Sequence, residues 1–170
     1  MANSTLSNET VYSKLKEKFG EAISENQEPF DLLTVEVSLN EIHNVIEWLK
    51  NEPSLQINYL TLIGGIHYPE NTGRELGVTY HLHSLIHNFR IRLKTFLSIE
   101  NPTIPTITDL YVGANWMERE TFDFYGVIFS GHPNLIRVLN EESMDYFPMR
   151  KEFRLEDGTR EDKDDRFFGR

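Results

Sequence analysis

The sequence contains no cysteine, which excludes disulfide bonds, thiolate-bound iron–sulfur clusters and cysteine-containing zinc sites. None of its apolar runs approaches the ~20 residues that a helix needs to span a lipid bilayer. The first sixty residues contain no arginine, and their four lysines are outnumbered by ten acidic residues. Because this acidic region repels phosphate groups, nucleic acid and an anionic membrane surface are both unsuitable partners for it.

Targeting and nucleotide-binding signals are missing as well. The amino terminus has neither the basic and apolar regions of a secretory signal nor the arginines of a mitochondrial presequence. The Gly64-Gly65 pair has no third glycine in register, and no Gly-x-x-x-x-Gly-Lys run occurs. We therefore expect a chain that is cytosolic, soluble by itself and unable to bind a nucleotide.

The composition is that of a globular protein followed by a charged tail. The chain has 170 residues, 39% of them hydrophobic, and a formal net charge of −10. A chain of this size can bury ~70% of its unfolded surface, so residues 1–153 are expected to form one domain. Residues 154–170 carry nearly balanced charges and few apolar residues, which predicts an extended tail that is disordered alone and binds a partner through Phe167 and Phe168.

Hydrophobic periodicity predicts the secondary structure. Helices are expected where apolar residues recur at helical spacing: 11–19, 40–51 with a Ser38/Glu41 capping box, and from Thr106 to a stop at Gly126. Strands are expected in four alternating or β-branched runs: 33–39, 55–66, 76–86 and 89–94. Asn88 marks a hairpin turn, 21–29 is expected to be a loop, and 127–129 a short strand. This order predicts an α+β fold, a two-layer sandwich of helices on a mixed, largely antiparallel sheet.

The most informative stretch runs from Trp116 to Leu139. It places charged residues among aromatic ones, followed by a helix-stopping glycine and a Gly-His-Pro turn. Such a pattern indicates a helix end that is buried against another surface, with its charges paired. The residues that form the pattern are Glu118, Arg119, Glu120, Asp123, Tyr125, Gly126, Phe129, Gly131, His132 and Pro133.

This order of residues resembles the signature of the subunit designated C in NADH-quinone oxidoreductase, the proton-pumping respiratory complex I. The segments around Arg137 and the Pro-Met-Arg-Lys run at Arg150 resemble the next parts of the family's sequence. In contrast, His67 stands before Tyr-Pro-Glu, where members of the family tend to have an acidic residue. The ten residues of the pattern, together with Arg137 and Arg150, are the expected partner-binding signature, and none of these twelve is expected to be catalytic.

The resemblance also implies a place and partners. It implies a non-catalytic structural subunit in the peripheral arm, on the cytoplasmic side of the bacterial inner membrane, that reaches the membrane only through the complex. The expected partners are the quinone-site subunit, designated D in this family of complexes, and neighbouring iron–sulfur subunits. NADH, FMN, iron–sulfur clusters and quinone would all belong to other subunits.

Three alternatives remain open from the residues alone. Glu118, Glu120 and Asp123 resemble an acid–base set, but no nucleophile lies nearby, and a structural ion-pair network with Arg119 is the favoured interpretation. His81 and His83 point to one face of a strand, as two zinc ligands would, so a small metal-binding module or enzyme is a rival function. Related membrane hydrogenases and ferredoxin-linked dehydrogenases carry equivalent subunits, which gives a further rival.

Two further histidines belong to these alternatives. His67 is a candidate third ligand from a neighbouring strand, although no carboxylate or cysteine completes the set. His132 is a candidate proton carrier, and its favoured role is a hydrogen bond that holds the turn before Pro133.

Overall fold

The computed structural model describes residues 6–27 and 29–153 of the chain. Apart from the 3-10 turns Gly20–Ala22 and Pro29–Asp31, ten helices and strands lie within these residues. They are α1 (Asn8–Phe19), β1 (Ile23–Gln27), β2 (Leu33–Val37), α2 (Ile42–Asn51), β3 (Tyr59–His67), β4 (Leu76–Ser84), β5 (Phe89–Leu97), β6 (Thr103–Pro105), α3 (Ala114–Tyr125) and β7 (Ile128–Ser130). The expected tail, 154–170, lies outside the described residues.

The larger sheet has five strands in the order β1-β2-β5-β4-β3. All of its pairings are antiparallel except that of β2 with β5, which is parallel. The β4–β5 hairpin turns at Asn88, whose φ of 50° is left-handed, as the sequence predicts. A separate pair joins β6 to β7 in parallel. The predicted α+β class and the mixed, largely antiparallel sheet are confirmed.

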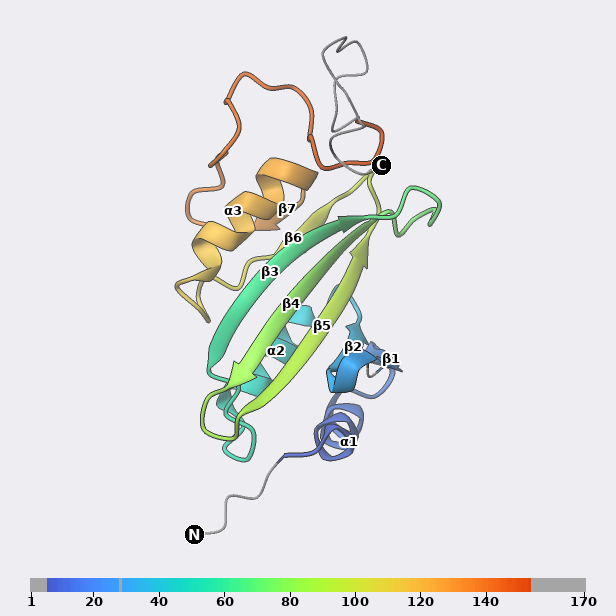
Figure 1. Cartoon of the computed structure of the whole chain (residues 1–170), viewed down its shortest axis with the longest axis vertical. Helices are drawn as coiled ribbons and strands as arrows, with labels where there is room; N and C mark the ends of the chain where they lie inside the picture. Colours follow the sequence, from blue (N-terminus) through green and yellow to red (C-terminus); the bar gives the residue numbers. More distant parts are fainter. Residues whose placement is uncertain (1–5, 28, 154–170) are drawn as a thin grey trace, which may run out of the picture.

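One face of the large sheet carries the core. Alternate residues of the central strands, including Val35, Leu93 and Tyr80, are buried together on this face. α1 and α2 add their apolar stripes to the same core, and α3 packs at the β3 edge, where the Tyr125 ring lies against Gly65. Figure 1 shows α2 behind β4 and β5, with the other side of the sheet toward the viewer.

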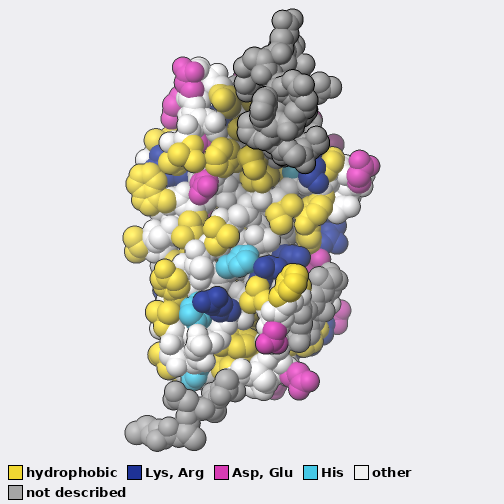
Figure 2. All heavy atoms as spheres, viewed as in Figure 1, with side chains coloured by type: hydrophobic (Ala, Val, Ile, Leu, Met, Phe, Trp, Pro, Cys, Tyr) yellow, Lys and Arg dark blue, Asp and Glu magenta, His cyan; other side chains and the backbone are white. Residues whose placement is uncertain are grey.

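We call this other side the open face. It is formed by the remaining alternate residues of the strands, and Figure 2 views it directly. Its members include Leu62, Thr79, His81, His83, Arg90, Arg92 and Lys94.

Four details of the predicted secondary structure are wrong. The polar run expected to be a loop contains β1, because Ile23 is buried and pairs with Val37. The run expected to be a strand from residue 55 begins only at Tyr59, because Gln56 adopts a φ of 47° that breaks an extended backbone. The capping box is absent: Glu41 is itself the N-cap of α2 and makes no side-chain cap bond.

The fourth error concerns the start of the last helix. α3 begins at Ala114 rather than near Thr106, and residues 107–113 form consecutive turns. The Tyr111 hydroxyl donates to the Ile57 carbonyl at 2.6 Å and holds these turns against the chain that enters β3. β6, which the sequence did not predict, ends at Pro105 in register with Ser130.

Within the described ranges, no helix is both long and apolar enough to cross a membrane.

Candidate functional site

α3 ends where the sequence predicts, and its end is tightly packed. Gly126 has a φ of 76°, and its N–H donates to the Phe122 carbonyl at 2.8 Å, which closes the helix. A Cβ at Gly126 would lie 2.5 Å from a ring carbon of Phe147. Similarly, a Cβ at Gly65 in β3 would lie 2.3 Å from Cδ2 of Tyr125. Two glycines therefore set how closely α3 approaches the sheet and the segment that follows it.

Asp123 is the most heavily bonded residue of α3. Its side chain is fully buried, and one carboxylate oxygen accepts hydrogen bonds from the backbone N–H groups of Val138, Leu139 and Asn140 at 3.0, 2.8 and 3.0 Å. The other oxygen accepts from Arg137 Nη1 at 2.8 Å and from the Asn140 side chain at 3.0 Å. Burial alone would raise the pKa of Asp123, but these bonds outweigh it and hold the pKa well below its usual range.

Arg137 completes the contact from the other side. Besides its ion pair with Asp123, it donates to the Asp123 carbonyl at 2.9 Å and to the carbonyls of Met144 and Tyr146 at 2.8 and 3.0 Å. Its guanidinium also stacks 5.2 Å from the centre of the Phe147 ring. One side chain thus joins α3 to a stretch of chain that has no helix or strand of its own.

Glu118 is buried on the opposite side of α3. Its carboxylate accepts from Thr106 Oγ1 at 2.5 Å and from the Ile107 N–H at 2.8 Å, which ties the helix to the chain after β6. Burial is the main influence on this group and raises its pKa to about 7, although both hydrogen bonds act in the opposite direction. Thr106 therefore donates a hydrogen bond to the side of α3 and, contrary to the prediction from sequence, it is not the first residue of the helix.

The prediction that Arg119 forms ion pairs with the acidic residues of its own helix is wrong. Arg119 is buried, but it donates to the carbonyls of Ile136 and Arg137, both at 3.1 Å, and stacks on the Trp116 ring. Helical spacing suggested a pair with Asp123, but one Asp123 oxygen accepts from loop amides and the other from Arg137 and the Asn140 side chain. Glu120 is exposed and makes no ion pair with any residue that the structure describes.

The Gly-His-Pro turn is fixed by internal bonds. His132 Nε2 contacts the Asn115 carbonyl at 3.1 Å, and Nδ1 accepts from the Asn134 N–H at 3.0 Å, so the neutral ring with its proton on Nε2 fits both. Gly131 has a φ of 85° that turns the chain, Pro133 is exposed, and the buried Phe129 in β7 anchors the turn. This geometry matches the structural role expected for His132.

Arg150 and His67 hold the last part of the segment. Arg150 Nε donates to the Tyr125 carbonyl at 2.8 Å and stacks over Phe147. His67, at the end of β3, accepts the Lys151 N–H at 2.9 Å through Nδ1. Sequence reasoning noted His67 as a departure from the family pattern but missed this contact, which no local sequence signal reveals.

The His81/His83 face does not have the arrangement of a metal site. Among the residues that the structure describes, no three His, Asp or Glu side chains gather at metal-binding distances. His81 Nε2 already accepts from Arg92 Nε at 3.1 Å. A guanidinium at this position would oppose a bound cation.

Together these bonds hold residues 131–153, the wrapping segment, against α3. Figure 1 shows it arching from β7 over the helix. Apolar side chains around this junction are left exposed, and we call them the exposed apolar set: Val112, Trp116, Ile136 and Leu139. Two of them, Val112 and Trp116, line a shallow groove of about 540 Å³ beside Gly131 and Pro133.

The fold and the site define a class of protein: a small α+β module whose buried charges brace a surface segment and leave apolar side chains exposed beside it. Residues 35–159 match the family described as "Respiratory-chain NADH dehydrogenase, 30 Kd subunit", and the chain belongs to this family. The family predicted from the signature is thereby confirmed.

Curated relatives agree with this assignment, and two of them are NADH-quinone oxidoreductase subunits designated C. The chain is 41% identical over 125 residues to the one from Mycolicibacterium smegmatis, covering 74% of this chain and 52% of that protein. It is 37% identical over 123 residues to the one from Streptomyces coelicolor, covering 72% and 49%. The chain therefore spans about half the length of the curated relatives it matches.

Solved structures share the fold. A trypsin-resistant fragment of Nqo5 superposes with a TM-score of 0.65 at 27% identity, covering 75% of this chain and 98% of the fragment. A chain of the membrane-bound sulfane sulfur reductase, an archaeal respiratory membrane complex, gives a TM-score of 0.70 at 23% identity, with 86% and 85% covered. At that lower identity the second likeness shows the fold alone.

Proposed function

We propose that this chain is a non-catalytic structural subunit of the peripheral arm of a proton-translocating NADH-quinone oxidoreductase. It docks the quinone-site subunit and neighbouring iron–sulfur subunits, on the cytoplasmic side of the bacterial inner membrane. The redox reaction takes place on cofactors held by those other subunits. The family membership and the names of the relatives support this role.

The observation that carries the proposal is where the signature charges are bonded. Asp123, Arg119 and Arg150 are bonded to backbone groups or side chains of this same chain. Charged side chains that are bonded in this way hold parts of the backbone in place and do not react with a substrate. A general acid or base needs an unoccupied hydrogen-bonding position within reach of the reacting atom. The absence of cysteine from the sequence also removes the thiolate ligands of iron–sulfur clusters.

The exposed apolar set gives the proposed docking surface. Val112 is 89% exposed and Leu139 is 66% exposed, near backbone groups that bond to the buried charges of α3. Apolar and aromatic side chains on a preordered surface favour association, because little conformational entropy is lost on binding. We assign the contact with the quinone-site subunit to this surface.

The test is co-purification of an affinity-tagged full-length chain from detergent-solubilised membranes. Wild-type chain should recover the quinone-site and iron–sulfur subunits in stoichiometric amounts, identified by mass spectrometry. The double variant Val112→Ser/Leu139→Ser should recover about thirtyfold less, since each truncated anchor costs on the order of 1 kcal/mol. Leu85→Ser/Ile86→Ser, at positions that are 60% and 55% exposed in the β4–β5 turn, is the matched control.

The identity of the recovered subunits separates the two family-level candidates. Recovery of hydrogenase or ferredoxin-linked dehydrogenase subunits would assign the chain to a related membrane complex. Recovery of no redox subunit at all would overturn both.

A further inference from the structure

The open face of the sheet carries positive charge in an acidic protein. Arg90, Arg92 and Lys94 alternate along β5 and point away from the helices. The net charge of the whole chain is −10. Figure 2 shows basic and histidine side chains at the centre of this face, with hydrophobic side chains around them.

These cations are not neutralised by the part of the chain that the structure describes. None of Arg90, Arg92 and Lys94 lies within ion-pair distance of a carboxylate there. Glu36, which is in register with Lys94, is bonded instead to Arg74 Nη2 at 2.7 Å. Arg92 contacts His81, whose pKa is lowered by burial and by the guanidinium itself, so this pair keeps one positive charge.

The signature arginines behave differently. Arg119, Arg137 and Arg150 each bond to carbonyls or a carboxylate of this chain. The guanidinium of Arg90 has no such partner among the described residues and is exposed. Arginine is the side chain best suited to bidentate recognition of a carboxylate, so Arg90 is available to another molecule, as are the guanidinium nitrogens of Arg92 that do not contact His81.

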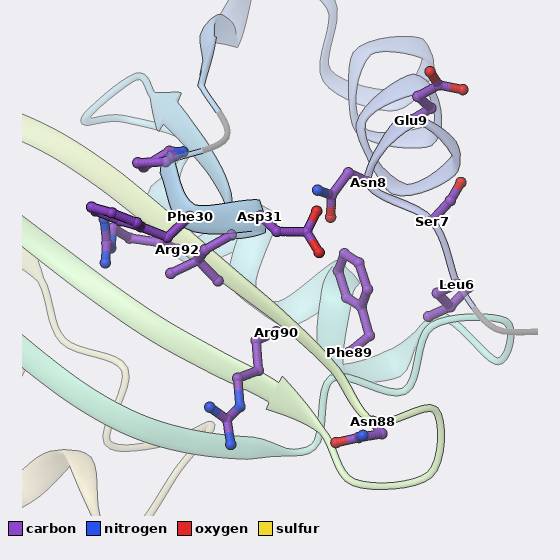
Figure 3. A pocket seen from close by; sticks show the side chains of 12 residues that line it. Leu6, Ser7, Asn8, Glu9, Phe30, Asp31, Asn88, Phe89, Arg90 and Arg92 are labelled. Atoms are coloured by element: carbon purple, nitrogen blue, oxygen red, sulfur yellow. The ribbon is translucent and has the colours of Figure 1, made fainter.

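Apolar side chains flank the cations on both edges of the sheet. Tyr59 and Leu62 on β3 are 50% and 46% exposed and lie in register with His83 and His81. At the other edge Phe30 is fully exposed and lines, with Arg90 and Arg92, a hollow of about 720 Å³ (Figure 3). The acidic Glu9 and Asp31 also line this hollow, and neither is within ion-pair distance of the two arginines. The φ of Phe30 is 57°, a left-handed conformation that costs a bulky residue about 1–3 kcal/mol and gains it no burial in its own fold.

We propose that the open face is a second docking surface, whose occupant is a surface of another subunit of the same complex that presents carboxylates between apolar side chains. This inference rests on the proposed function and adds the surface and the chemistry of the partner. Three unneutralised cations suit a few carboxylates, whereas a nucleic acid or an anionic bilayer would also meet the acidic remainder of the chain. Strands of nine residues extend about 30 Å, a span adequate for one side of a standard interface.

The first experiment locates the occupant by photo-crosslinking. The full-length tagged chain carries p-benzoylphenylalanine in place of Leu62, and it is irradiated within the membrane-bound complex. We expect a crosslink to a peptide of another subunit, and that peptide should contain at least two Asp or Glu residues near the linked position. The control position is Glu47, exposed on α2 on the helical side of the molecule.

Each other outcome overturns the inference. A crosslink to this chain's own residues, to a second copy, to lipid or to a peptide without carboxylates rejects the proposed occupant. So does a yield at Leu62 no higher than that at Glu47. If the tagged chain recovers the complex but Leu62 remains unlinked, only this inference fails; if it recovers no redox subunit, the proposed function fails.

The second experiment tests the charge. Arg90→Glu should lower recovery of the crosslinked subunit about tenfold at moderate salt, because like charges then face each other across the interface. Lys18→Glu on α1 makes the same change in net charge at another exposed position and should leave recovery unchanged. Equal recovery with the two variants would show that the positive charge of the open face has no part in docking.

Discussion

The sheet layer and the wrapping segment are held together by different forces. In the sheet, strands such as β4 and β5 pair along their full nine-residue length over aliphatic side chains that exclude water. The wrapping segment, residues 131–153, has no helix or strand, and charged side chains of α3 and of the segment itself bond its backbone directly. Burial acts over area and tolerates local change, whereas a charged hydrogen bond depends on a single atom in a fixed place.

This difference predicts where the molecule is fragile. A strand that loses one methyl group keeps most of its buried area. The wrapping segment depends on Asp123 and Arg137 so heavily that removal of either leaves the other charge buried and uncompensated. Segments with few apolar contacts open at lower free energy than core strands.

The largest effect on stability is expected from Asp123→Asn. The variant cannot accept all five hydrogen bonds and leaves Arg137 without its counter-charge, so unfolding free energy should fall by about 3–5 kcal/mol. Urea denaturation measures the loss, and hydrogen exchange should show amides 138–140 opening while β4–β5 stays protected. Glu120→Gln, exposed on the same helix, is the control. Equal stability of the two variants would show that the wrapping segment does not depend on the charge of Asp123.

A smaller loss is expected at the junction of the two regions. Gly65→Ala places a methyl group 2.3 Å from Tyr125 Cδ2 and should cost about 1–3 kcal/mol through overpacking. For a chain of this size that lowers the melting temperature by roughly 2–4 °C per kcal/mol. Gly64→Ala meets Thr79 Oγ1 at an ordinary 3.5 Å and should melt close to wild type. A similar melting temperature for both variants would mean that α3 shifts freely on the sheet.

Next in size is a pH-dependent effect at Glu118. Because folding raises its pKa from 4.5 to about 7, its protonation favours the folded state below about pH 4.5, and this contribution is lost as the pH rises through 7. Glu118→Gln removes the titration, so its stability relative to wild type should rise between about pH 4.5 and 7, by about 1–3 kcal/mol. Denaturation curves at several pH values measure the difference, and a constant difference would show that Glu118 does not titrate in this range.

The smallest effect on stability is expected from Val112→Ser/Leu139→Ser. Both side chains are largely exposed, so unfolding free energy should change by less than about 0.5 kcal/mol per site, even though recovery of partner subunits falls. Urea denaturation of the isolated chain is the measurement. A loss of several kcal/mol would mean that the exposed apolar set stabilises the fold rather than binding partners.

Much of the sheet layer could be predicted from sequence because its signal is periodic. Val35, Leu93 and their neighbours alternate with polar residues, and Gly126 stops a helix as expected. β1 and β6 could not be predicted, since their short runs become strands only through a neighbour such as Val37 or Phe129. Their burial is a property of the whole fold.

The candidate site was predicted in its residues but not in its contacts. The signature order located Glu118, Arg119 and Asp123, yet helical spacing suggested that they pair with one another. Their partners are mostly backbone N–H and C=O groups, which every residue carries and which therefore leave no mark in a sequence.

The parallel pairing of β2 with β5 has a consequence for synthesis of the chain. The pairing aligns Leu33 with Ile91, so β2 has only β1 beside it until the β4–β5 hairpin has been made. Closing so long a loop costs entropy before any contact rewards it, which makes such pairings slow. In contrast, Asp123 meets Val138, Leu139 and Asn140 after a short stretch of chain. The contacts between α3 and the wrapping segment therefore join residues that are close in sequence, which favours fast folding. The central pairing of the sheet joins residues that are far apart in sequence, and it can form only after β5 has been synthesised.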